Sequence, residues 1–145
     1  SLVVIITLIA IYKLQIPELH DNWIGKLDQI KQEKTDNSIV FINAWWQFRP
    51  FSYYYNYEAF LDYNNTLKIL SKDNIHAIFS TEQMEKIMAD KKFDKIFLVK
   101  NQGVKSSEFI ECLKEKGYEV SWEINKKPPL IFALQPKNEN IKPSL

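Results

Sequence analysis

The chain switches repeatedly between two spacings of apolar residues, and this alternation limits its fold more than any other feature. Short runs rich in apolar residues, such as 38–43 and 93–99, are typical of strands in a sheet that is covered on both faces. Stretches of about 10 to 15 residues with helical spacing separate them. Strands that alternate with helices predict βαβ units. We therefore predict an α/β fold, a small three-layer Rossmann-like domain with a mainly parallel sheet of about five strands.

The expected elements follow one another along most of the chain. Helical spacing or helix-capping residues predict helices at 17–33, 50–60, 82–90 and from Ser106 to a stop at Gly117. Strands are predicted at 38–43, 75–79, 93–99, 118–124 and 130–134. The run 67–70 fits either a short strand or the last turn of a helix. A turn at 125–129 joins the last two strands, which should form a C-terminal antiparallel hairpin.

The length of the chain limits the number of its domains, and its charge limits the kinds of partner it can bind. With 145 residues, of which 46% are hydrophobic, it is long enough for one domain with its own core and short for two. We expect residues 15–137 to form this single α/β domain and the polar residues 138–145 to be a loose tail. The net charge is +1 and the lysines are scattered, so the composition predicts no nucleic-acid partner.

Residues 1–14 form an apolar N-terminal segment in which only Thr7 interrupts the run 2–12. This run is shorter than the roughly 20 residues that a membrane-spanning helix needs. It fits a buried first strand, the hydrophobic part of a signal peptide, or the end of a transmembrane helix. Tyr12 and Lys13 are an aromatic and a basic residue of the kind found where a helix leaves the bilayer. Because no small-residue cleavage site follows, the end of a transmembrane helix is the favoured interpretation.

The segment 45–57 is the richest in aromatic residues. Six of its thirteen residues are Trp or Tyr, and it also holds two Phe and the only Arg of the chain. It follows the strand 38–43 and so begins at the carboxyl edge of the sheet, where open α/β sheets usually bind ligands. Such a cluster is either core or a recognition surface. We expect Phe51, Tyr54 and Tyr55 in the core, and the candidate substrate-binding residues are Trp45, Trp46, Arg49 and Tyr53.

The sequence lacks the residues that nucleotide-binding sites, disulfides and metal sites need. The three glycines, Gly25, Gly103 and Gly117, are isolated, whereas dinucleotide and phosphate loops need glycines close together. Cys112 is the only cysteine, so the chain can form neither an intrachain disulfide nor a multi-cysteine metal site. The two histidines lie far apart in the sequence. We therefore assign no catalytic residue, no cofactor and no metal site.

Taken together, several segments resemble one family. They are the apolar helix end, a connecting helix that contains Asp21-Asn22-Trp23, the strand 38–41 introduced by Asp36, the run 50–55, and the strand 95–99. This succession is similar to the soluble C-terminal domain of bacterial polytopic membrane glycosyltransferases. The group includes the dolichyl-phosphate-mannose-protein mannosyltransferases and the aminoarabinose transferases. The resemblance covers most of the chain.

The resemblance implies an enzyme of the cell membrane that uses a polyprenyl-phosphate-linked sugar and carries its catalytic acidic residue in an early extracytoplasmic loop, outside this chain. The domain itself would be a non-catalytic accessory domain on the extracytoplasmic side, joined to the membrane through its N-terminal segment. Its aromatic residues would line an approach for the lipid-linked sugar or the acceptor, because Trp and Tyr offer flat apolar faces to sugar rings. Arg49 would meet a phosphate through its fork of donors.

Two other functions fit the same residues. One is a membrane-anchored, non-enzymatic domain that docks a partner protein on its aromatic residues. The other is a free-standing soluble α/β enzyme in which residues 2–11 form the first strand. The residues encoded before Ser1 separate the three: many hydrophobic spans with an acidic first loop indicate the glycosyltransferase, a single span the anchored domain, and none the soluble enzyme.

Overall fold

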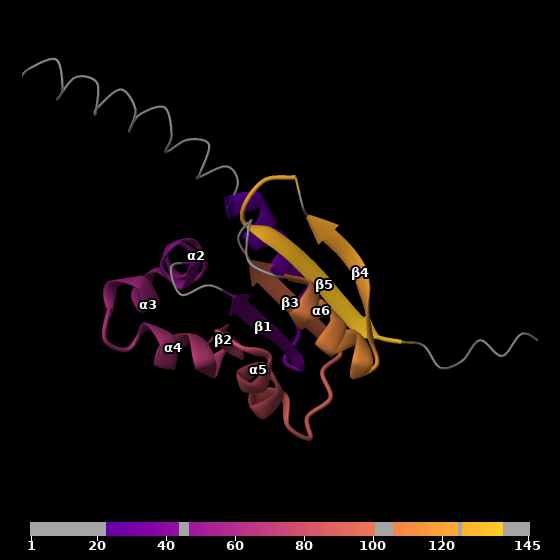
Figure 1. Cartoon of the computed structure of the whole chain (residues 1–145). Helices are drawn as coiled ribbons and strands as arrows, with labels where there is room; N and C mark the ends of the chain where they lie inside the picture. Colours follow the sequence, from indigo (N-terminus) through magenta and orange to yellow (C-terminus); the bar gives the residue numbers. More distant parts are fainter. Residues whose placement is uncertain (1–22, 44–46, 101–105, 125, 138–145) are drawn as a thin grey trace, which may run out of the picture.

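A five-stranded sheet forms the centre of the computed structural model, which describes residues 23–43, 47–100, 106–124 and 126–137 (Figure 1). Its strands are β1 (Ser38–Asn43), β2 (Ile75–Ile78), β3 (Lys95–Lys100), β4 (Tyr118–Ile124) and β5 (Leu130–Pro136), in the order β2-β1-β3-β5-β4. β2 and β3 pair with β1 in parallel, and β5 pairs antiparallel with both β3 and β4. Four strands therefore run in one direction, which confirms a mostly parallel α/β sheet with a C-terminal hairpin.

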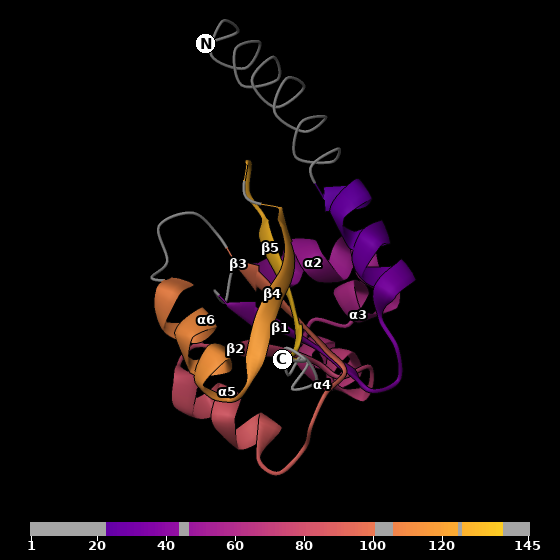
Figure 2. The ribbon, with the colours of Figure 1, turned by 90° about the vertical axis from the view of Figure 1, so that its right-hand side faces the viewer.

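Helices cover both faces of the sheet, so the elements form three layers. Figure 2 shows α5 and α6 on one side of the sheet, and the helix at 23–33 and α2 on the other. The helices are that at 23–33, α2 (Phe48–Tyr55), α3 (Tyr57–Leu61), α4 (Thr66–Lys72), α5 (Thr81–Met88) and α6 (Ser106–Glu115). Within the part of the chain described, no helix is both long enough and apolar enough to cross a membrane.

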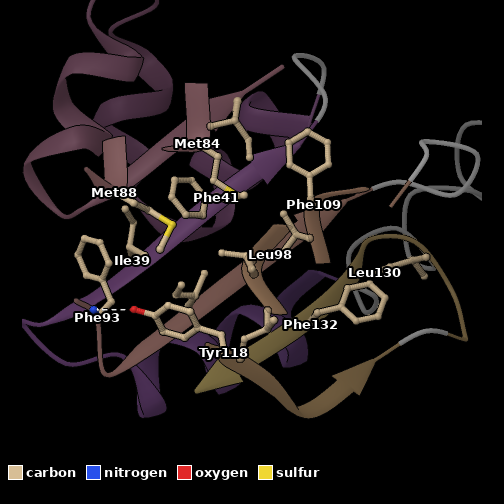
Figure 3. Close-up of a cluster of buried hydrophobic side chains, with 14 residues drawn as sticks. Ile39, Phe41, Met84, Met88, Phe93, Leu98, Phe109, Tyr118, Leu130 and Phe132 are labelled. Carbon is tan, nitrogen blue, oxygen red and sulfur yellow. Dashed lines mark hydrogen bonds between the residues drawn. The ribbon is translucent and has the colours of Figure 1, made fainter. Parts of the chain in front are cut away.

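Side chains along each strand alternate between the two faces, and both faces are apolar because helices cover both. On β1, Ile39 and Phe41 face α5 and α6, whereas Val40 and Ile42 face the opposite helices. Figure 3 shows the first of these two clusters, with Met84 and Phe109 packed on the strand residues. These two buried clusters explain why the inner strands have continuous apolar runs in the sequence.

The last strand lies inside the sheet rather than at its edge. β5 is buried from Leu130 to Leu134, between β3 and β4. β4 is an edge strand in which exposed residues such as Glu119 and Glu123 alternate with more buried ones. The continuous apolar run of β5 and the alternation of β4 match these two positions. The hairpin was predicted, but the order of its two strands in the sheet was not.

One predicted helix is divided in two. Residues 50–60 were expected to form a single helix, whereas α2 ends at Tyr55 and α3 begins at Tyr57. The prediction was wrong because Asn56 adopts an extended conformation, with φ −145° and ψ 96°, and its side chain accepts a hydrogen bond of 3.0 Å from the Ala59 N–H. Asn is a favoured N-cap residue, so it starts a new helix here. The ambiguous run 67–70 belongs to α4.

The helix at 23–33 crosses the sheet from its carboxyl edge to its amino edge. Near its start, Lys26 donates hydrogen bonds to the carbonyl groups of Lys127 and Pro129, in the turn between β4 and β5. At its end, Glu33 accepts a hydrogen bond of 2.6 Å from Lys95, the first residue of β3. The described part of the chain therefore begins near the carboxyl edge of the sheet. The apolar segment 1–14 and the tail 138–145 lie outside the described residues.

Candidate functional site

The described part of the aromatic segment begins at the carboxyl edge of the sheet. β1 ends at Asn43, and Gln47 precedes α2, which carries Arg49 and Tyr53. Pro50 lies in the first turn of α2, where its missing N–H costs no intrahelical hydrogen bond. Two of the four predicted binding residues, Trp45 and Trp46, lie outside the described residues. Arg49 and Tyr53 can be placed.

The inner side of α2 is core. Phe51 is fully buried and stacks on Tyr55, with 5.1 Å between ring centroids, and Trp23 meets the Phe51 ring edge-on. Tyr54 stacks on Trp23, and both Tyr54 and Tyr55 are partly buried against this cluster. Burial raises the pKa of both tyrosine hydroxyls, so they stay neutral at physiological pH. The assignment of Phe51 to the core is confirmed.

An aromatic surface lies on the outer side of α2, on α3 and in the turn after α3. We define it as Tyr53, Tyr57, Phe60 and Tyr63. The exposed fractions of the three tyrosines are 44%, 54% and 71%. Tyr53 meets Tyr57 and Phe60 edge-on, at 5.5 and 5.0 Å between ring centroids. Tyr57 and Phe60 stack at 5.7 Å. These ring contacts hold the side chains in defined orientations while leaving much of the tyrosine area accessible.

Arg49 lies beneath this surface as a link between helices. Its Nη1 donates a hydrogen bond of 2.8 Å to the Phe60 carbonyl and one of 3.3 Å to the Thr66 hydroxyl. The guanidinium carbon lies 4.3 Å from the Phe60 ring centroid and 4.9 Å from that of Tyr63. Arg49 therefore joins α2 to α3 and to the start of α4. Tyr53 is exposed as a binding residue requires, whereas Arg49 has structural partners.

The described residues show little of the chemistry that catalysis requires. They contain no group of three or more His, Cys, Asp or Glu side chains that could hold a metal ion. His76 lies on the edge strand β2, and burial together with nearby Lys91 lowers its pKa, which leaves the imidazole neutral at physiological pH. Burial and Glu85 raise the pKa of the Cys112 thiol, which disfavours the reactive thiolate. The aromatic surface can bind flat apolar faces and accept or donate hydrogen bonds through its tyrosine hydroxyls.

A second feature was not predicted from the sequence. Asn43, Gln47 and Lys100 are polar, lie at the carboxyl edge of the sheet and are only 4%, 6% and 5% exposed. We call them the carboxyl-edge polar group. Among the described side chains, the Asn43 Oδ1 and Gln47 Oε1 atoms are buried without a hydrogen-bond partner. Such an atom costs about 1–3 kcal/mol. The available signal was that Asn43 and Lys100 are polar residues that end apolar strands.

A surface hollow of about 640 Å³ lies at the opposite, amino edge of the sheet. Its walls include four exposed lysines, Lys91, Lys92, Lys116 and Lys137. Lys116 makes an ion pair of 2.9 Å with Glu85, and this hydrogen bond raises the pKa of Lys116. Lysines near the ends of helices complement the negative end of the helix dipole. This role accounts for Lys91, Lys92 and Lys116, which follow the ends of α5 and α6, whereas Lys137 follows β5.

Comparisons with protein-family models, curated proteins and solved structures found no match for this chain. The functional candidates are thus the aromatic surface and the carboxyl-edge polar group, each defined by its own geometry. The first is exposed and apolar, and the second is buried and polar.

Proposed function

We propose that this chain is a non-catalytic, extracytoplasmic accessory domain of a bacterial membrane glycosyltransferase, and that it helps to recognise a polyprenyl-phosphate-linked sugar or its acceptor. The observation that carries the proposal is the aromatic surface, in which Tyr53, Tyr57 and Tyr63 are all substantially exposed. Exposed tyrosines grouped around one another suit a sugar, because a ring face packs on the apolar side of the sugar while a hydroxyl reaches its polar groups.

The position of the aromatic surface supports a role close to a membrane. The helix at 23–33 starts at the carboxyl edge of the sheet, as the hydrogen bond from Lys26 to Pro129 indicates. If residues 1–14 are the end of a transmembrane helix, the carboxyl edge of the sheet faces the bilayer. α2 follows β1 from the same edge. Tyrosine is enriched at membrane interfaces, where a lipid-linked sugar is also presented.

We propose that the domain is Rossmann-like, on the strength of the parallel order β2-β1-β3 and the helices on both faces. In such sheets the connections from β1 and β3 leave toward opposite sides, and ligands bind near the carboxyl ends of the strands at that point. The hairpin of β4 and β5 replaces the further parallel strands of a larger sheet.

The test is a double replacement, Tyr53→Ser with Tyr57→Ser, in the full-length protein that contains this chain. The assay measures sugar transfer from a water-soluble, short-chain polyprenyl-phosphate sugar. Two lost ring contacts of about 1 kcal/mol each correspond to a roughly 30-fold lower transfer rate. Phe79→Ser is the matched control, since Phe79 is an exposed aromatic residue that follows β2 rather than lying on α2 or α3. Unchanged transfer in a folded double variant refutes the proposal.

A membrane-anchored interaction domain is the alternative function. It is favoured by exposed aliphatic side chains near the tyrosines in sequence, Leu61 at 64% and Leu67 at 47%. Tyrosines with exposed leucines also fit a protein partner, because protein interfaces are enriched in Tyr and apolar contacts. The number of hydrophobic spans encoded before Ser1 distinguishes the two functions. Many spans support the glycosyltransferase, and a single span supports the anchored domain.

A further inference from the structure

The surface hollow at the amino edge of the sheet is a third candidate, beside the aromatic surface and the carboxyl-edge polar group. Its volume of about 640 Å³ lies within the range of roughly 300–1,000 Å³ that is usual for ligand pockets. Four lysines line the hollow, and among the described residues that line it Asp90 is the only acidic one. A concave surface lined mainly by one sign of charge concentrates molecules of the opposite charge.

Three segments of the chain bring the lysines to this hollow. They are the residues after α5, α6 and β5, which carry Lys91 with Lys92, Lys116, and Lys137 respectively. The Tyr118 hydroxyl accepts a hydrogen bond of 2.9 Å from the Phe93 N–H, which joins the start of β4 to the segment after α5. The Lys137 N–H donates a bond of 2.8 Å to the Gly117 carbonyl. The backbone that carries the lysines is therefore tied together by hydrogen bonds.

The turn after α5 forms part of the wall and has a strained backbone. Ale residue at its start, Ala89, has φ 37° and ψ −119°, a positive φ that residues with a side chain rarely adopt. Two hydrogen bonds of 2.7 Å retain this turn, from the Ala89 N–H to the Glu85 carbonyl and from the Lys91 N–H to the Met88 carbonyl. Strained residues that their surroundings hold in place are concentrated at binding sites.

Three of the four lysines have no acidic partner. Lys116 pairs with Glu85 at 2.9 Å. Within the part of the chain that the structure describes, Lys91, Lys92 and Lys137 form no ion pair. The C-terminal end of a helix carries only about half a unit of negative charge, so the ends of α5 and α6 do not neutralise these ammonium groups. The hollow therefore keeps an excess of positive charge that an acidic ligand can meet.

The surroundings of the hollow favour separate carboxylates over a phosphate. Phosphate sites commonly use helix N-termini, glycine-rich loops or the donor fork of arginine. The hollow instead lies at the C-terminal ends of α5 and α6, where the partial charge is negative. Lysine is a point charge on a flexible stem, so each exposed ammonium group can meet one carboxylate away from the helix ends. This arrangement suits a ligand with several spaced single negative charges.

We propose that the hollow binds an acidic segment of a partner protein, a stretch of peptide rich in Asp and Glu. Lys91, Lys92 and Lys137 pair with its carboxylates. Asp90 accepts from the backbone N–H groups of the peptide, whereas it would repel a ligand that is negative throughout. The site lies at the edge of the sheet opposite to the one where the aromatic segment begins. It goes beyond the proposed function and does not rest on it.

The experiment is an NMR titration of the isotopically labelled full chain with a short, capped peptide of alternating glutamate and aspartate. The matched probe is the same peptide with glutamine and asparagine, and inorganic tripolyphosphate tests for a phosphate site. We expect saturable amide shifts at Lys91, Gly117 and Lys137 with the acidic peptide, and at least about tenfold weaker binding of the neutral one. The affinity should fall as salt is raised, because exposed ion pairs are screened.

Two double variants test the contacts. Lys92→Gln with Lys137→Gln removes two charges from the hollow and should weaken binding of the acidic peptide roughly tenfold, as expected for two exposed ion pairs. Lys68→Gln with Lys126→Gln is the matched control, since it removes the same charge from exposed residues of α4 and of the turn between β4 and β5. The control should keep its affinity within about twofold. If the first double variant does not fold, Lys92→Gln alone decides.

Three outcomes overturn the inference. The first is the absence of saturable shifts at the hollow. The second is an equal loss of affinity in both double variants, which would indicate attraction to the charge of the whole chain. The third is tighter binding of tripolyphosphate than of the acidic peptide at the same residues, which would indicate a phosphate site. The result is independent of the sugar-transfer assay, because no residue that lines the hollow belongs to the aromatic surface.

Discussion

Replacing Arg49 with methionine should loosen α3 from α2 and lower the stability of the whole domain. Methionine keeps much of the apolar stem but removes the hydrogen bonds to the Phe60 carbonyl and the Thr66 hydroxyl. It also removes the guanidinium from the Phe60 and Tyr63 rings. The Thr66 hydroxyl keeps a partner, because it donates to the Ala59 carbonyl at 2.8 Å. For the Phe60 carbonyl, the bond from Arg49 is replaced only by water.

The size of the effect follows from these contacts. A hydrogen bond from a charged donor contributes about 1.5–3 kcal/mol, and a cation–π contact at a partly exposed site about 0.5–1 kcal/mol. The contacts share one side chain that is partly exposed, so they do not add fully. We expect the free energy of unfolding to fall by about 2 kcal/mol. Urea denaturation measures this change, and a constant slope shows that the compactness of both states is retained.

A local measurement shows where the stability is lost. In α3, the Phe60 N–H bonds to the Asn56 carbonyl and the Asp62 N–H to the Glu58 carbonyl. These two amides should exchange with solvent faster in Arg49→Met than in the native protein. Arg49→Lys should recover part of the stability, because lysine retains a charged donor without the planar fork.

A matched control variant lies on α4. Lys68→Met removes a charge from an exposed residue of α4 and should change stability by less than about 0.5 kcal/mol. The structural role of Arg49 is refuted if Arg49→Met is as stable as the native protein. If that stable variant also fails to bind a sugar phosphate, the original prediction of Arg49 as a phosphate ligand gains support instead.

Two further predictions concern the ends of the sheet. Burial alone raises the pKa of Glu33, but hydrogen bonds from Lys95, Trp122 and Gln29 outweigh it and hold the pKa below its ordinary value. This stabilisation is present at neutral pH and is lost as the pH falls below about 4.5, so urea midpoints should decline less on acidification in Glu33→Gln than in the native protein. An equal decline contradicts the network. Gly117→Ala meets no atom within 4 Å but forces alanine to φ +88°, so thermal unfolding should show a loss of about 1–2 kcal/mol. No loss of stability would show that the backbone relaxes there.

The sequence allowed much of the fold to be predicted because local spacing reflects local surroundings. The strands at Ser38–Asn43 and Lys95–Lys100 lie between two layers of helices, so both of their faces are apolar. The edge strand Tyr118–Ile124 alternates for the opposite reason. The division of one predicted helix at Asn56 was missed because its capping bond depends on a backbone conformation that apolar spacing does not reveal.

The candidate sites were only partly predictable. Tyr53 was named from the sequence and is exposed, and Phe51 was assigned to the core and is buried. Arg49 was predicted as a phosphate ligand from its place among aromatic residues, and that role stays a prediction. Its bond to the Phe60 carbonyl arises from a fold between two helices that the sequence presented as one.

The sequence by itself determined the type of most elements, the class of the fold and which side chains avoid water, since these follow from the periodicity of apolar residues along a few turns or one strand. Only the tertiary structure decided the strand order, in which β5 lies between β3 and β4, and the pairing of Asn43 with Lys100 across β1 and β3. The physical reason is the separation along the chain. Asn43 and Lys100 are far apart in the sequence and become neighbours only because β1 and β3 pair. A pattern of neighbouring residues contains no information on which strands will pair.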